Sequence, residues 1–380
     1  MQNAQSTSYW EQKTFLKNID FLIIGAGIVG YSTALHLREQ YPESKIVILE
    51  RGILPSGASS KNAGFACFGS ATELFSDLQS MPEDMVWETV ELRWKGLQYL
   101  RSIVGDDGLD LHINGSWDLI TEQESELFDS SRDKIDYFNA QLKSITGESD
   151  VYSVDDAVGN KFGFNKIKTS IFNRLEGQID TAKMNDTFYK RIVQANIHVL
   201  FGVEAREVHE QQNGVILETN YGEIFSKKVA ICTNGFAAQF IEDEDIHPAR
   251  AQVIITKPIP NLKIKGTFHY NQGYYYFRNI DNRILFGGGR NLNFEEETTT
   301  DLGTTSLIQN QLRTLLNDII LPNQAVEIEH SWSGIMGVGN SKKPIIKQHS
   351  GNVFCGVRLG GMGVAIGTLV GKELASLIKY

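Results

Sequence analysis

Residues 21–30, Phe21-Leu22-Ile23-Ile24-Gly25-Ala26-Gly27-Ile28-Val29-Gly30, decide the fold of this chain. The four apolar residues before Gly25 are typical of a buried strand, and the residues after Gly30 continue in a helical register. A second apolar run at residues 46–49 ends at Glu50. The first fifty residues therefore predict a parallel unit of strand, helix and strand.

The glycines of this stretch have the spacing Gly25-x-Gly27-x-x-Gly30 between the expected strand and helix. The first allows a tight turn, the second lets the backbone approach a pyrophosphate, and the third lets the helix pack on the strand. The start of the helix offers free N–H groups to the phosphates. Glu50, 20 residues after Gly30, is placed to hold the ribose hydroxyls, and its charge disfavours NADP. The motif predicts binding of FAD or NAD.

A second loop of small residues follows the ribose acid, Gly57-Ala58-Ser59-Ser60-Lys61-Asn62-Ala63-Gly64. Its hydroxyls and its lysine suit a pyrophosphate and the edge of an extended flavin. Simple nicotinamide dehydrogenases have no obvious use for such a loop, although a structural loop rich in serine and glycine remains the alternative. The sequence therefore favours FAD over NAD.

Residues 20–30, Glu50-Arg51 and residues 57–64 resemble the FAD-dependent D-amino acid oxidase superfamily, which includes glycine, sarcosine and γ-glutamylputrescine oxidases. Further segments agree with the resemblance: residues 176–180 with Gly202-Val203, residues 232–236 with 247–253, and residues 355–364. The resemblance implies an α/β fold, in which a Rossmann-like FAD-binding domain of the glutathione reductase type is interleaved with an α+β substrate domain on an antiparallel sheet. We expect the first domain at residues 15–75, 150–240 and 341–380, and the second at 76–149 and 241–340.

The motifs and the resemblance together assign cofactor binding to residues in six segments of the chain. They are Gly25, Gly27, Ile28, Val29, Gly30, Glu50, Arg51, Ala58, Ser59, Ser60, Lys61, Asn62, Ala63, Gly64, Val203, Thr233, Asn234, Gly235, Arg358, Leu359, Gly360, Gly361, Met362, Gly363 and Val364. We expect FAD to be held without a covalent bond, because Cys67 and Cys355 read as small buried thiols.

The candidate catalytic residues are Tyr274, Tyr276, Arg278 and Arg290. The first three alternate along an expected strand, so they share one face, which could line a cavity above the flavin. An aromatic strand that only packs its sheet is the alternative. The family's substrate-binding arginine and oxygen-activating lysine align with Met336 and Leu285, which weakens the expectation of α-amino acid oxidation and of fast reaction with oxygen.

The resemblance implies oxidation of the C–N bond of a small amine or amino acid by hydride transfer to flavin N5. Water then hydrolyses the imine, and oxygen or another electron acceptor takes the electrons. This chemistry requires no acid or base from the protein, and no histidine stands at catalytic spacing from a serine, cysteine or acid in the sequence. The alternatives are oxidation of a 2-hydroxy acid or a modified nucleobase, and an electron-transfer flavoprotein subunit without catalysis of its own.

Composition narrows the remaining possibilities for this chain of 380 residues. Lys and Arg number 36 against 46 Asp and Glu, a net charge of −10, so DNA and anionic membranes are disfavoured as partners. The three distant cysteines indicate a reducing compartment rather than a disulfide framework. The polar N-terminal residues lack the features of a signal peptide, and no stretch resembles a membrane span. We expect a cytoplasmic protein without a metal site.

Overall fold

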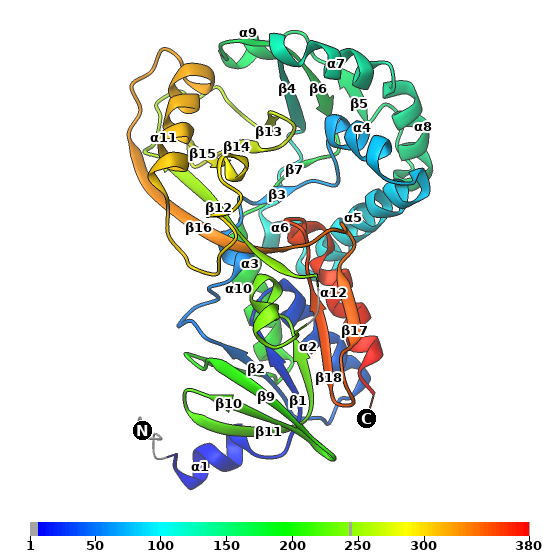
Figure 1. Ribbon diagram of the computed structural model, residues 1–380, viewed down its shortest axis with the longest axis vertical. Helices are drawn as coiled ribbons and strands as arrows, with labels where there is room; N and C mark the ends of the chain where they lie inside the picture. The colour runs from blue at the N-terminus through cyan, green and yellow to red at the C-terminus, as the bar shows by residue number, and fades with distance from the viewer. Residues whose placement is uncertain (1–6, 243–244, 380) are drawn as a thin grey trace.

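The computed structural model describes residues 7–242 and 245–379, and it is built on two large sheets that lie one above the other in Figure 1. The first sheet has the strand order β17-β18-β11-β1-β2-β8, with β10 and β9 added beside β11. Its strands are β1 Ile19–Ile24, β2 Ile46–Glu50, β8 His198–Phe201, β9 Ala205–Gln211, β10 Gly214–Thr219, β11 Gly222–Ile231, β17 Ile345–Gln348 and β18 Val353–Val357.

The predicted unit of strand, helix and strand is confirmed. Strand β1 is parallel to β2, and helix α2, Ile28–Gln40, connects them. The helix packs so closely on its own strand that a Cβ atom on Gly30 would lie 2.0 Å from the carbonyl oxygen of Gly25. The glycine at position 30 is therefore required by packing.

The end of the chain returns to its beginning. Strand β18 joins the sheet parallel to β11, and helix α12, Gly363–Leu377, packs against α2 and against α5, Glu83–Val104. Strands β9, β10 and β11 form an antiparallel meander within this sheet. Helix α10, Thr181–Gln194, also lies against α2.

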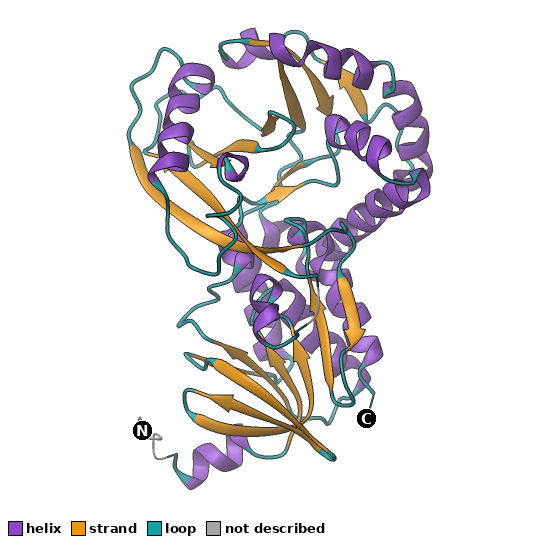
Figure 2. Ribbon diagram, in the orientation of Figure 1, coloured by secondary structure: helices purple, strands orange, loops and turns teal. Residues whose placement is uncertain are grey.

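The second sheet has the order β16-β12-β15-β14-β13-β4-β6-β5. Its strands are β4 Ser116–Thr121, β5 Tyr152–Val154, β6 Ile167–Asn173, β12 His247–Thr256, β13 Thr267–Tyr270, β14 Tyr275–Ile280, β15 Arg283–Gly288 and β16 Ile328–Val338. Helix α11, Ser306–Leu315, covers one face with an apolar core that includes Phe268, Phe277 and Leu312. Three further helices of this half lie at the upper right of Figures 1 and 2: α4, Ala71–Ser80, α7, Ser125–Arg132, and α8, Ile135–Thr146.

The boundary expected at residue 150 needs a correction. Strands β5 and β6 lie in the second sheet, because β6 pairs antiparallel with β4 and β5 pairs with β6. We therefore propose that the middle segment of the first domain begins after Asn173. The other boundaries remain as proposed from the sequence.

The described helices include none that is both long enough and apolar enough to cross a membrane.

Candidate functional site

The two glycine-containing loops of the sequence meet at the start of α2. Gly27 is the N-cap of the helix and has no side chain of its own to cap it. The short helix α3, Ala58–Lys61, brings Ser59 to this point, where its Oγ accepts a hydrogen bond of 3.0 Å from the backbone N–H of Ile28. The helix start and the serine hydroxyl are thus arranged as the donors of a phosphate site.

Glu50 ends β2 and is buried beside this loop. Its Oε1 accepts hydrogen bonds from the Ser56 hydroxyl at 2.7 Å and the Gly52 N–H at 3.0 Å, and its Oε2 accepts one from the Ala26 N–H at 3.3 Å. The Val203 N–H donates to the Glu50 carbonyl oxygen at 3.0 Å. The structure therefore brings three predicted segments together around Glu50.

Beside Glu50 lies a pocket of about 390 Å³ that Arg51, Gly52 and Ser56 help to line. The Arg51 guanidinium lies over the ring of Phe236, 3.9 Å from its centroid. The pocket is large enough for a nucleobase or a sugar. It fits the adenosine end of a dinucleotide.

The terminal loop after β18 is fixed by contacts on one side and open on the other. The Asn234 side-chain oxygen accepts a hydrogen bond of 3.2 Å from the Leu359 N–H, and Arg358 pairs with Asp245 at 3.1 Å. A Cβ atom on Gly360 or Gly363 would meet nothing within 4 Å. The backbone of this loop therefore faces free space where a flat ring could approach.

These residues fit FAD. The glycine-capped start of α2 and the Ser59 hydroxyl suit its pyrophosphate, and the open backbone at Gly360 and Gly363 suits the flavin ring. Thr233, another predicted cofactor residue, has a buried hydroxyl without a hydrogen-bond partner among the described residues, so it is free to bind a ligand. The predicted cofactor residues are thus compatible with the cofactor that the sequence favours.

One face of the second sheet lies on the segment that continues from the 57–64 loop. Pairing across the strands places Asp118, His269, Tyr276, Gly287, Val253 and Trp332 in one row on this face. The Phe65 ring contacts His269 and Tyr276 edge to face, at centroid distances of 5.4 and 5.6 Å. The Trp332 indole N–H donates to the Lys61 carbonyl oxygen at 3.0 Å. We call this surface the site face.

Tyr276 and Arg278 lie on the site face as the alternation predicts, whereas Tyr275 and Phe277 belong to the core beneath α11. Burial raises the pKa of the Tyr276 phenol to about 12 and lowers the pKa of the Arg278 guanidinium to about 10. The Arg278 Nε donates to the Ala63 carbonyl oxygen, so this arginine holds the loop segment against the sheet. No carboxylate of the described chain lies within ion-pair distance of it.

Tyr274 and Arg290 occupy a more exposed place. Tyr274 comes before β14, is 44% exposed and contacts the ring of Phe294, over which the Arg290 guanidinium also lies at 4.9 Å. Burial lowers the pKa of Arg290, and its Nε has no partner among the described residues. The four candidates therefore form two pairs rather than one cluster.

Leu285 and Met336, which take the places of a lysine and an arginine in the resemblance, both lie near the expected flavin site. Leu285 packs with Ala63 and Val253 on the site face. A Cβ atom on Gly361 would lie 3.3 Å from the Met336 sulfur. These positions present apolar side chains to the site.

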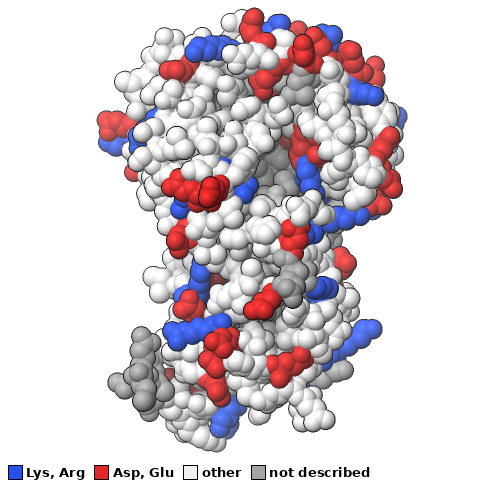
Figure 3. All heavy atoms as spheres, viewed as in Figure 1, with Lys and Arg blue, Asp and Glu red and all other residues white. Residues whose placement is uncertain are grey.

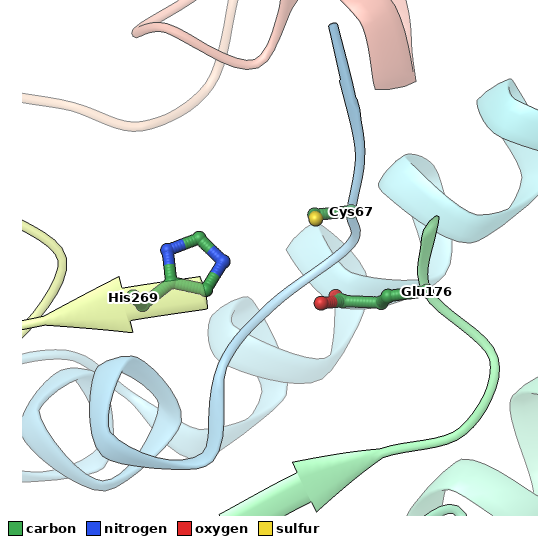
Figure 4. Close-up of side chains that lie close together, drawn as sticks. All are labelled: Cys67, Glu176 and His269. Atoms are coloured by element: carbon green, nitrogen blue, oxygen red, sulfur yellow. The ribbon is translucent and has the colours of Figure 1, made fainter. Parts of the chain in front are cut away.

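A polar cluster that the sequence motifs do not predict lies at one end of the site face (Figure 4). Ligand atoms of Cys67, Glu176 and His269 lie within 4.8 Å of one another. Asp118 lies opposite His269 on the adjacent strand β4. Burial raises the pKa of the Glu176 and Asp118 carboxyl groups, and the charge of His269 opposes part of this rise. These residues are far apart in the chain, and only the pairing of β4 with β13 brings Asp118 and His269 together.

Comparisons with known proteins agree with this arrangement. A model of the FAD dependent oxidoreductase family, DAO, matches residues 20–377. The probable oxidoreductase OrdL of Haemophilus influenzae is 19% identical, over 96% of this chain and 84% of the relative. The gamma-glutamylputrescine oxidoreductase of Escherichia coli is 20% identical, over 95% of this chain and 83% of the relative.

Solved structures confirm the predicted fold. The L-proline dehydrogenase from P. horikoshii superimposes with a TM-score of 0.74 at 17% identity, and the match covers 96% of this chain and 94% of that one. The glycine oxidase from Bacillus cereus has a TM-score of 0.71 at 17% identity, with 94% of each chain covered.

Proposed function

Because the chain belongs to the FAD dependent oxidoreductase family, we propose that it oxidises the C–N bond of a small amine or amino acid. The observation that carries the proposal is the site face, where a row of polar and aromatic side chains lies directly on the segment that continues from the predicted flavin loop. The relatives named as a gamma-glutamylputrescine oxidoreductase and a sarcosine oxidase subunit support this class of substrate.

Bound FAD would supply the hydride acceptor, N5, for the carbon next to the nitrogen, with water to hydrolyse the resulting imine and oxygen or another acceptor to take the electrons. The protein's part is to position the substrate and to exclude water. Tyr276 and Phe65 form an aromatic wall, and Arg278 and Arg290 are the cations available to orient a substrate anion.

We propose that FAD is bound without a covalent link. Cys355 is fully buried inside β18, and burial raises the pKa of the Cys67 thiol well above its usual range. The raised pKa of Cys67 disfavours the thiolate that would attack a flavin ring, and Cys355 is enclosed within the sheet. Three buried cysteines without a disulfide also fit a reducing compartment such as the cytoplasm.

The test is an anaerobic panel in which primary amines, secondary amines, amino acids and 2-hydroxy acids are mixed with the FAD-loaded protein. We expect amines or amino acids to bleach the flavin absorbance near 450 nm, a general property of flavins on reduction, within seconds to minutes. Bleaching by hydroxy acids alone would replace the C–N proposal with C–O oxidation. Bound FAD that no compound bleaches, together with a second chain that copurifies, would identify an electron-transfer subunit.

A further inference from the structure

The polar cluster on the site face contains two carboxyl groups whose hydrogen bonding is incomplete. Glu176 is fully buried, and its Oε1 accepts hydrogen bonds from the N–H groups of Phe68 at 2.8 Å and Gly69 at 2.9 Å. Asp118 is 5% exposed, and its Oδ2 accepts from the Thr72 N–H and hydroxyl at 3.2 Å each. The Glu176 Oε2, the Asp118 Oδ1 and the His269 Nε2 are buried without a partner among the described residues.

The basic member of the cluster is His269, whose charge acts on both carboxyl groups. In residues 7–242 and 245–379, no lysine or arginine pairs with either carboxylate. Arg278 is on the same face but is held by the carbonyl oxygen of Ala63. The Phe65 ring, further along the same segment, contacts His269 and Tyr276. A buried carboxylate oxygen without a hydrogen-bond donor is costly, so a positively charged ligand would complete this cluster.

We propose that Glu176, Asp118 and His269 form a cation subsite within the substrate site, and that it selects amines carrying a second positive charge. This inference rests on the proposed function, because it names the class of amine that the same site accepts. The group bound there is the ammonium group of the substrate that is not oxidised. A carboxylate stabilises the ammonium form, whereas the nitrogen that is oxidised must be neutral.

The surroundings favour an organic ammonium over a metal ion. The rings of Phe65 and Tyr276 stand beside His269, and aromatic rings are typical of sites for alkylammonium groups. Cys67 is the remaining candidate metal ligand, and burial together with Glu176 raises the pKa of its thiol, which disfavours the thiolate that a metal needs. In the view of Figure 3, the surface is hollowed near the place where Figure 1 draws the antiparallel pair of β3, Phe65–Ala66, and β7, Gly177–Gln178. This hollow is the approach that we infer for the ligand.

The test compares three probes of equal chain length with the holoenzyme: 1,5-diaminopentane, pentylamine and 5-aminopentanoate. Their far ends carry a positive charge, no charge and a negative charge. Binding is measured from the change in the flavin absorbance spectrum, and reduction is measured anaerobically by stopped flow. We expect the diamine to bind at least tenfold more tightly than pentylamine, and the amino acid to bind more weakly than either. Equal affinity for the three probes in the wild-type protein would overturn the inference.

Variants of the cluster and of a matched exposed acid sharpen this test. Glu176→Gln should abolish the preference for the diamine by raising its KM with little change in kcat, whereas FAD content stays the same. Asp118→Asn serves if Glu176→Gln does not fold. Glu207→Gln, whose carboxylate lies beside His209 in the exposed β9–β10 hairpin, is the control and should keep the preference. A preference that survives both cluster variants contradicts the subsite.

Two further outcomes separate this inference from the proposed function. Diamine binding that depends on Glu176 but reduces no flavin would support the subsite and reject amine oxidation. Stoichiometric zinc or iron in the purified protein, found by elemental analysis and lost in Glu176→Gln, would show a metal site and overturn the inference.

Discussion

Gly30 and Gly363 each lie in the first turn of a helix at the predicted FAD site, but a methyl group would meet different surroundings at the two positions. At Gly30 it would lie 2.0 Å from the Gly25 carbonyl oxygen, whereas at Gly363 it would meet nothing within 4 Å. Packing within the protein explains the first glycine. The second has no such explanation, so a bound ligand is the reason we infer for it.

Gly363→Ala should therefore leave the fold intact but weaken FAD binding. Alanine is favoured over glycine by about 0.5–1 kcal/mol in the middle of a helix and by less at its first residue, where Gly363 stands. The apoprotein should therefore be unfolded at an equal or slightly higher urea concentration. We expect the Kd for FAD, measured by calorimetry on apoprotein, to rise at least tenfold. Gly30→Ala is the contrasting variant and should lower the stability of the apoprotein. Unchanged FAD affinity in Gly363→Ala would remove this residue from the cofactor site.

At the scale of elements, Glu73 on α4 connects three parts of the chain. Its carboxylate pairs with Arg93 of α5 at 3.1 Å and with Lys342, in the segment before β17, at 2.6 Å. Burial raises the pKa of Glu73, but the charges of Arg93 and Lys342 outweigh burial and lower it to about 2. The ionised form is thus the one that the folded protein prefers.

The sign of the pH effect follows from this shift. A carboxyl group with a lowered pKa in the folded state stabilises the fold at pH values above its ordinary pKa of 4.5, and this contribution is lost as the pH falls toward 2. Glu73→Gln should lower the free energy of unfolding by about 1–3 kcal/mol at pH 7, and the difference from wild type should shrink at pH 3. Urea denaturation at both pH values measures it.

The exposed pair of Glu88 with Lys343 provides the control for this prediction. Their side chains are 59% and 49% exposed, so Glu88→Gln should change the stability by less than about 1 kcal/mol at either pH. Asp77, which also pairs with Lys342, has its pKa raised by burial. Its contribution to the pH dependence of stability is therefore opposite in sign to that of Glu73. A loss in Glu73→Gln that does not depend on pH would mean that packing rather than charge explains the effect.

Elements with strong local signals could be predicted from the sequence. The apolar runs and glycines of residues 21–50 indicate the first strand, helix and strand, and the alternation at residues 274–278 separates the site face from the core at Tyr276 and Phe277. Strand β5 has only three residues and pairs with β6, so its sheet is decided by a contact that the local sequence does not encode. The contact of Cys67 and Glu176 with His269 is of the same kind.

At the scale of the whole molecule, the predicted cofactor residues come from both ends and from the middle of the chain. Helix α12 packs against α2, the Asn234 side chain accepts from the Leu359 N–H, and the Val203 N–H donates to the Glu50 carbonyl. A ligand that contacts all these segments would connect parts of the first sheet that are more than a hundred residues apart in the chain. FAD should therefore stabilise the molecule as a unit.

Removing FAD should lower the melting temperature and loosen both ends of the chain together. A ligand present at 100 times its Kd stabilises the folded state by about 2.7 kcal/mol, which corresponds to a shift of roughly 3 °C in a chain of this size. Hydrogen exchange should show protection by FAD at residues 25–30, 57–64, 233–235 and 358–364. ADP, which lacks the flavin, should protect residues 25–30 and leave the exchange of residues 358–364 unchanged. If FAD protected residues 25–64 but not residues 358–364, the terminal glycine loop would not contact the cofactor, and this prediction would be wrong.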